Sequence, residues 1–166
     1  MTLLENINSR PLPLARLMGI TFTHAEPDKV IARMVVRPDL CTLGHRMHGG
    51  SAMALADTTG GAATLVNLPA SANGTTTIES KTNFLGAADE GSTVIATATP
   101  LHRGRRTQVW QTRLETEEGK LVALVTQTQL ILSWPWPALR RVPMRARAEF
   151  GNALAAACFA THCSTR

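Results

Sequence analysis

The chain lacks any run of apolar residues long enough to cross a membrane as a helix, which takes about 18 or more. Its N-terminal stretch contains Glu5, no long apolar core and no small-residue cleavage site, so we expect no secretory signal and a cytoplasmic location. At 166 residues it has room for one domain with a sizeable core but not for two ordinary ones.

Cysteine is scarce, with Cys41, Cys158 and Cys163 as the complete set. No CxxC spacing or nearby histidine pair accompanies them, which excludes a disulfide framework and the common zinc sites, so we expect reduced thiols. The chain also lacks the GxxxxGKS and GxGxxG loops of nucleotide-hydrolysing and dinucleotide-binding folds, and Ser51 has no GxSxG context. We expect no metal and no cofactor.

Charge is unevenly distributed. Residues 1–134 hold 12 Lys and Arg against 11 Asp and Glu, whereas residues 135–166 hold 5 Arg against Glu149 alone. The net charge of +5 therefore belongs mainly to the C-terminal stretch. No aromatic residues interleave with these arginines as a nucleic-acid stacking surface requires. We interpret residues 135–166 as a basic, poorly ordered tail and expect no nucleic-acid partner.

One long helix is expected among six strands. A short helix over 11–18 follows a flexible lead, and the long helix starts at Gly49 or Gly50 and ends near Asn67, before Pro69. Thr-, Val- and Ile-rich segments with alternating polarity predict the strands. These strands cover residues 20–25, 29–37, 75–84, 92–101, 106–117 and 121–133.

The connectors between the last four strands are short, at residues 86–91, 102–105 and 118–120. Turns of this length join antiparallel neighbours. One helix does not cover a six-stranded sheet from outside, so we predict an α+β fold in which an antiparallel sheet of five to six strands wraps around one central helix. The predicted domain spans residues 20–134, after an N-terminal lead over residues 1–19.

The stretch HGGSAMALADTTGGAAT, from His48 to Thr64, carries the main chemical pattern. Asp57 is the one charged residue between His48 and Asn67, and Asp is a poor helix former that is costly to bury unpaired. Gly49 and Gly50 offer bare backbone N–H groups at the positive end of the helix. A fixed carboxylate and a site for developing negative charge are what acyl transfer needs. The alternatives are an exposed helix Asp, a strain-relieving Gly pair and a packing role for His48.

Gly49 and Asp57 are eight residues apart, which corresponds to about 12 Å along a helix. An oxyanion donor and a nucleophile must both lie within roughly 3 Å of one reacting carbonyl. One helix cannot achieve this. If the two groups cooperate, two chains supply them from antiparallel helices, and we predict at least a homodimer with two equivalent sites.

A second candidate is the basic turn of residues 102–106, HRGRR. Guanidinium groups around a glycine suit the phosphates of a coenzyme A handle, although basic turns are often only solvated. The candidate phosphate contacts are Arg103, Gly104, Arg105 and Arg106. Other polar residues near the helix entrance or the following strand can orient water or substrate, although structural hydrogen bonding is the alternative. These are Thr42, His45, Thr77 and Asn83.

In combination, HGGxxxxLAD, TNFLGAADEG, HRGRRT and EGKLVALVTQTQ resemble the hotdog-fold acyl-CoA thioesterases over roughly residues 12–133. The chain is similar to the phenylacetate-degradation (PaaI-like) branch, which includes one type of 4-hydroxybenzoyl-CoA thioesterase. The resemblance implies dimers whose sheets join, often tetramers, with sites between subunits. It also implies that Asp57 is the nucleophile or general base and that the Gly49 N–H polarises the thioester carbonyl. His48 would order the loop.

The chain departs from the family pattern at Thr42, where Asn or Gln often positions water or the carbonyl. Threonine is shorter, and His45 or Thr77 are candidates to replace it. The tail is also outside the family pattern.

Two other functions stay open. A hotdog hydratase or dehydratase needs a positioned His with an acidic partner, usually in a GDxNPxH-like context that is missing here. A non-catalytic acyl-CoA-binding regulator would normally carry a helix-turn-helix, which the first 20 residues cannot hold. The acyl group, and dimer versus tetramer, are left undecided by the sequence.

Overall fold

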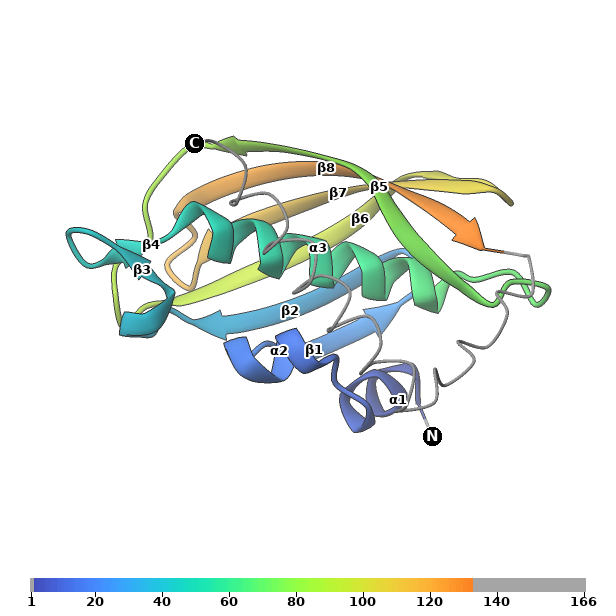
Figure 1. Ribbon diagram of the computed structural model, residues 1–166, viewed down its shortest axis with the longest axis horizontal. Coiled ribbons are helices and arrows are strands. Elements are labelled where there is room, and N and C mark those ends of the chain that lie inside the picture. Colours follow the sequence, from blue (N-terminus) through green and yellow to red (C-terminus); the bar gives the residue numbers. More distant parts are fainter. Residues whose placement is uncertain (1, 133–166) are drawn as a thin grey trace, which may run out of the picture. The chain divides into compact units, whose positions relative to one another are not determined.

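The computed structural model describes residues 2–132. Cys158, Cys163 and the predicted tail lie outside the described residues. A six-stranded antiparallel sheet has the order β1-β2-β6-β7-β8-β5, and one long helix, α3 (Gly49–Val66), lies along one face of it (Figure 1). The helix touches every strand of this sheet. The predicted α+β architecture with a central helix is therefore confirmed.

The strands follow the predicted segments closely. Alternation of apolar and polar residues produces β2 and β7, in which every second side chain is buried. The strand bounds are β1 Thr21–Glu26, β2 Lys29–Val35, β5 Gly74–Phe84, β6 Thr93–Arg103, β7 Thr107–Thr116 and β8 Leu121–Leu132. A 3₁₀ turn at Pro38–Leu40 and a small hairpin of β3 (Cys41–Thr42) and β4 (Arg46–Met47) lead into α3.

Small residues on α3 let it lie close to the sheet. Ala52, Ala56 and Ala63 are almost completely buried, and Leu55 is the large apolar side chain that the helix buries fully. Across the sheet, Trp110 and Leu114 of β7 are also fully buried. The core is therefore one layer between α3 and the inner face of the sheet.

Two predictions were wrong. The N-terminal lead is not flexible chain but a helix, α1 (Leu3–Ser9), whose first turn carries a reciprocal capping box between Thr2 and Glu5. The short helix expected after it is present as α2 (Pro13–Met18).

The second error concerns β5 and β6, which were expected to be antiparallel neighbours. Instead β5 pairs with β8, and β6 pairs with β2. The connector after Phe84 crosses the end of the sheet, where the N–H groups of Leu85 and Gly86 both donate to the carbonyl of Val122. A Cβ at Gly86 would overlap the carbonyl oxygen of Leu121, so this crossing requires glycine.

Strand β5 is an edge of the sheet, and its register with β8 shifts between Thr77 and Glu79. The irregularity leaves Ile78 as an extra residue, which is the geometry of a β-bulge. The inner face of β5 therefore changes from odd to even positions along the strand. Thr77 and Phe84, seven residues apart, both face α3.

Candidate active site

Asp57 lies on the side of α3 that faces the β8–β5 edge of the sheet. Its side chain is exposed, as are Met53 and Leu65 on the same side of the helix. The neighbouring helix residues Thr58, Thr59 and Gly60 are buried. The carboxylate therefore stands at the boundary between the packed and the open sides of the helix.

One oxygen of this carboxylate is fixed by two partners from different strands. Oδ1 of Asp57 accepts a hydrogen bond from the hydroxyl of Thr77 on β5 at 2.7 Å. It also accepts one from the amide Nε2 of Gln127 on β8 at 3.3 Å. No described residue supplies a partner for Oδ2. This arrangement orients the carboxylate and leaves Oδ2 free to meet a substrate or water.

Thr77 is oriented in turn by the next inward residue of β8. The amide Nε2 of Gln129 donates to Oγ1 of Thr77 at 2.7 Å, and Oε1 of Gln129 accepts from the hydroxyl of Thr75 at 3.0 Å. Because Oγ1 of Thr77 already accepts one hydrogen bond, its own hydrogen is directed to Asp57. Thr75, Gln129, Thr77 and Asp57 thus form one continuous series of hydrogen bonds.

Gly60 makes room for the second partner. A Cβ at Gly60 would lie 2.5 Å from Cδ of Gln127, which is closer than real side chains approach. Gln127 is fully buried, so its side chain has no free space into which it could move away from such a Cβ. Because Gly60 has no side chain, the Gln127 side chain fits between β8 and α3 and reaches Asp57.

At the start of α3, the ring of His48 caps the helix. Its Nδ1 accepts the Gly50 N–H at 2.9 Å, whereas no described residue accepts from the Gly49 N–H. A Cβ at Gly49 would lie 3.1 Å from the ring of Phe84. His48 therefore orders the helix entrance, and Gly49 keeps an unpaired N–H beside an aromatic ring.

A cavity of about 280 Å³ opens at this helix end, and Thr42, Gly49 and Phe84 are among its lining residues. Thr42 is exposed on β3, as expected for a residue near the helix entrance. His45 is outside the cavity, and its Nδ1 lies 2.8 Å from Oε2 of Glu90. Asn83 is exposed on β5 and does not line the cavity either.

The basic turn lies at the other end of α3, between β6 and β7. Only glycine fits at position 104, because a Cβ there would lie 2.9 Å from the Thr107 carbonyl oxygen and 2.6 Å from the His102 ring. The guanidinium of Arg103 donates to the carbonyl of Pro27 at 3.2 Å and to Oδ1 of Asn67 at 3.3 Å. Arg103, Gly104 and Arg105 border an open cavity of about 440 Å³, which Arg106 does not line.

The predicted residues thus fall into three groups along α3. Gly49 and Thr42 are at its start, Asp57 and Thr77 at its middle, and the basic turn is near Asn67 at its end. A single chain does not bring the Gly49 N–H and Asp57 to one reacting atom, in agreement with their separation of about 12 Å along the helix. Within the described residues, no cluster of three or more His, Cys, Asp or Glu side chains could hold a metal ion.

Sequence reasoning missed Gln127, Gln129 and Phe84. The glutamines did leave a signal, because TQTQ in β8 places them on the strand face that also carries the buried Val125. A polar residue at a buried position of an alternating strand needs a partner, and here the partners are Asp57 and Thr77.

Comparison with known proteins agrees with this architecture. Residues 44–123 match the model of the thioesterase superfamily. A protein of Mycobacterium tuberculosis named "Putative esterase" is 32% identical over 114 residues, which cover 68% of this chain and 81% of that protein.

Two solved structures have the same fold. A thioesterase of Haemophilus influenzae superposes with a TM-score of 0.73 at 30% identity, covering 80% of this chain and 92% of that one. A mutant of the phenylacetic acid degradation protein PaaI from Thermus thermophilus superposes with a TM-score of 0.67 at 28% identity, covering 73% and 100%.

Proposed function

The chain belongs to the thioesterase superfamily, with the hotdog fold, and its relatives support a hydrolase acting on thioesters. From this premise we propose that it hydrolyses an acyl-coenzyme A thioester to the free acid and coenzyme A. The observation that carries the proposal is the exposed Asp57 carboxylate, held through Oδ1 by Thr77 and Gln127 with Oδ2 left open.

In the proposed reaction, Asp57 either attacks the thioester carbonyl, which breaks the C–S bond and forms an anhydride that water then hydrolyses, or takes a proton from the water that attacks the carbonyl. On either route coenzyme A leaves as a thiolate and takes up a proton to become the free thiol. The Gly49 N–H and the positive end of α3 stabilise the negative charge that develops on the carbonyl oxygen. His48 keeps the helix start ordered by capping Gly50, and Thr42 lies at the cavity where the thioester or water would be positioned. Arg103, Arg105 and Arg106, around Gly104, are the proposed phosphate contacts.

The site requires two chains in this proposal, with Gly49 of one copy facing Asp57 of the other. The exposed edge of β5 is the surface through which two sheets would join, since Ile78 and Phe84 on this strand are 56% and 54% exposed. A twofold dimer places the two α3 helices antiparallel and produces two equivalent sites. A dimer of such dimers remains compatible with the proposal.

Thiol release tests the activity. We expect the wild-type protein to release free thiol from at least one member of a panel of aryl and alkyl acyl-CoAs, and Asp57→Ala to lower kcat about 10²- to 10⁴-fold while acyl-CoA still binds. Asp28→Ala, at the β1–β2 turn, is the matched control. Full activity in Asp57→Ala would refute the assignment. Binding without turnover by the wild type would favour the acyl-CoA-binding regulator.

Mixing two inactive variants tests the shared site. Gly49→Val removes the space against Phe84, and Asp57→Ala removes the carboxylate. When the two proteins are unfolded and refolded together at equal amounts, half of the dimers are mixed, and each mixed dimer has one intact site. We therefore expect about a quarter of the wild-type activity to return. No recovery, with mixed dimers demonstrated by mass, would mean that each site lies within one chain.

A further inference from the structure

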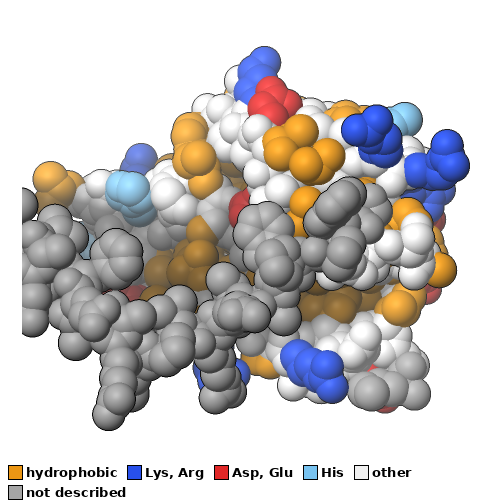
Figure 2. Space-filling model, turned by 45° about the vertical axis from the view of Figure 1, so that its right-hand side comes forward, with side chains coloured by type: hydrophobic (Ala, Val, Ile, Leu, Met, Phe, Trp, Pro, Cys, Tyr) orange, Lys and Arg blue, Asp and Glu red, His pale blue; other side chains and the backbone are white. Residues whose placement is uncertain are grey.

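A large apolar side chain is exposed in the first half of α3. Met53 is 42% exposed, although its neighbours Ala52 and Leu55 are buried. Exposure alone does not mark an interface residue, because hydrophobic side chains are exposed at several places on the surface (Figure 2). The spacing of Met53 from the two ends of the proposed site is what distinguishes it.

Met53 lies halfway between Gly49 and Asp57. It is four residues from each of them, which corresponds to about one turn and about 6 Å along the helix, so the three positions share one side of α3. In a twofold pair of antiparallel helices, opposing positions are equally far from the symmetry axis. If Gly49 of one chain faces Asp57 of the other, position 53 therefore faces its own copy.

The geometry of β5 agrees with this position of the axis. Thr77 hydrogen-bonds to Asp57, and seven residues later Phe84 lies against the start of α3, so the strand runs antiparallel to the helix. The midpoint of this strand segment, at Ser80 and Lys81, is exposed and lies level with the midpoint of the helix segment. A β5 edge that pairs with its own copy about this midpoint shares a twofold axis with the helices.

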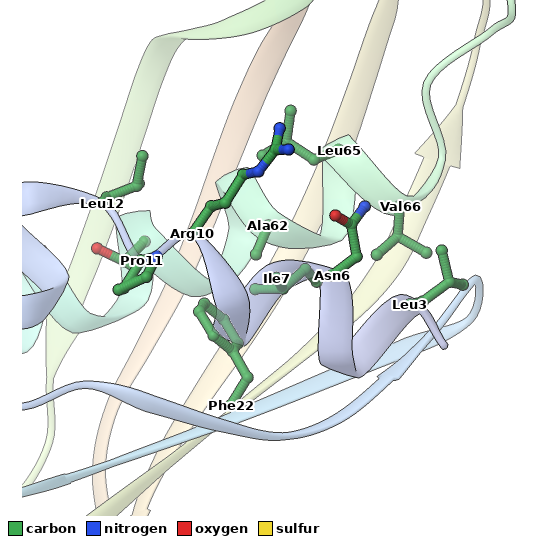
Figure 3. A pocket seen from close by; sticks show the side chains of 11 residues that line it. Leu3, Asn6, Ile7, Arg10, Pro11, Leu12, Phe22, Ala62, Leu65 and Val66 are labelled. Carbon is green, nitrogen blue, oxygen red and sulfur yellow. The ribbon is translucent and has the colours of Figure 1, made fainter. Parts of the chain in front are cut away.

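The later part of α3 is arranged differently. Leu65 is also exposed, but it borders a cavity of about 310 Å³ that Ile7 of α1 and Phe22 of β1 line as well, and the Arg10 side chain extends toward it (Figure 3). The N-terminal part of the same chain thus lies beside this end of the helix. In a pair centred on Met53, the two copies of Leu65 would be about 36 Å apart along the helix axes.

We propose that Met53 meets its own copy on the twofold axis of the dimer and that the two side chains form the wall between the two active sites. The proposal rests on the proposed function, in which each site takes Gly49 from one chain and Asp57 from the other. The two helices cannot touch at those residues, because a thioester carbonyl has to fit between them. Methionine has a long, unbranched and flexible side chain, which fills the remaining gap at the axis and excludes water from both sites.

Crosslinking at position 53 tests the axis without depending on turnover. In a Cys41→Ser, Cys158→Ser and Cys163→Ser background, we expect ortho-phenylenedimaleimide, a short thiol crosslinker, to join Met53→Cys chains into dimers. Gly61→Cys is the matched control, because a Cβ there meets open space. Its copies would be about 24 Å apart along the helix axes, so crosslinked dimer should be about tenfold less abundant. Equal crosslinking at the two positions, or none at position 53, would overturn the inference.

Charge substitution gives a second test. Met53→Lys and Met53→Asp each place two like charges at the axis, which should weaken self-association about 10²-fold or more. An equimolar mixture of the two variants should dimerise again, because an ammonium then opposes a carboxylate. Gly61→Lys and Gly61→Asp, the control pair, should dimerise both separately and mixed. Sedimentation velocity measures each case, and intact dimers of either Met53 variant alone, or no recovery in the mixture, would overturn the inference.

Thiol release separates this inference from the proposed function. A wild type that hydrolyses acyl-CoA, combined with no crosslinking at position 53, would overturn the inference about the axis and leave the hydrolysis standing. Crosslinking at position 53 as expected, in a protein that releases no thiol from any acyl-CoA, would refute the proposed function while supporting the position of the axis.

Discussion

The two edges of the sheet are treated differently. At β1, the side chain of Asn8 on α1 hydrogen-bonds to both backbone groups of Phe22, donating to its carbonyl at 2.9 Å and accepting from its N–H at 3.2 Å. At β5, an 11-residue strand, most side chains are exposed, and the described residues place no element beyond it. Proteins usually cover or interrupt an edge, because a bare strand pairs with other chains.

The difference indicates which edge of the sheet has a partner within the chain. Helix α1 covers the β1 edge, whereas the outer edge of β5 has no neighbouring strand or helix among the described residues. The proposed catalytic carboxylate is on the β5 side, where Thr77 of that strand holds it. We infer that the open edge and the active site depend on the same partner chain.

The largest expected effect comes from blocking the open edge. In a twofold pairing of β5, residues near the middle of the strand oppose their own copies, so Ile78→Lys would bring its charge near Lys81 of the second copy. We expect the proposed dimer to dissociate and kcat to fall about 10²-fold or more, because Asp57 would lose the proposed oxyanion donor of the second chain. Ultracentrifugation and thiol release measure both. Thr23→Lys on β1 should change neither, and an active Ile78→Lys monomer would contradict the shared site.

The next effect distinguishes the packed and open sides of α3. Gly60→Ala forces its new methyl group against Gln127, whereas Gly61→Ala meets open space. We expect Gly60→Ala to lower the free energy of unfolding by about 1–3 kcal/mol through overpacking. Gly61→Ala should raise it by about 1 kcal/mol through helix propensity. Urea denaturation checks both, and equal effects would mean that Gln127 does not occupy the space under Gly60.

A smaller effect is expected at the covered edge. Asn8→Ala removes both hydrogen bonds to Phe22 and should lower the free energy of unfolding by about 1 kcal/mol, with the dimer intact. Urea denaturation at constant protein concentration measures it. Asn8→Asp keeps the acceptor for the Phe22 N–H but places a second carboxylate oxygen against the Phe22 carbonyl oxygen, so it should be at least as destabilising as Asn8→Ala. A gain in oligomer size for Asn8→Ala would instead show that the β1 edge pairs once it is uncovered.

The smallest effect concerns pH, near the end of β2. Hydrogen bonding to Arg37 holds the pKa of Asp39 below its ordinary value. This contribution to stability is present above the ordinary carboxylate pKa of about 3.9 and is lost as the pH falls through the lower pKa of the folded state. Asp39→Asn should therefore slightly lower the melting temperature at pH 7 and lower it by less at pH 2. An equal difference at both pH values would exclude the ion pair as the cause.

Much of the fold could be predicted from local patterns. Alternating strands and a Gly-to-Pro helix segment are encoded by neighbouring residues, and the structure confirms them. Helix α1 could also have been predicted, because Thr2 and Glu5 have the spacing of a capping box. The position of β5 in the sheet could not be predicted, because a short connector to β6 indicates a hairpin. Strand β5 instead pairs with β8, which depends on contacts between residues far apart in the chain.

The candidate site shows the same limit. Asp57 and the HGG sequence stand out because a charge and two glycines are unusual in an apolar helix. Gln127 lies 70 residues from Asp57 in sequence, and its role depends on how β8 passes under Gly60. Single-sequence patterns identify a candidate reacting group more readily than the partners that orient it.

Because of the bulge at Ile78, the number of residues between Thr77 and Phe84 matters as much as the identity of those residues. Thr77 precedes it and reaches Asp57, while Phe84 follows it and covers Gly49. Since successive residues of a strand face opposite sides, deleting one residue there would turn either Thr77 or Phe84 outward. Homologous chains that conserve both contacts should therefore tolerate many substitutions in β5 but not a single insertion or deletion between these two residues. An alignment gap in this interval would accordingly mark a relative with a different arrangement around the carboxylate.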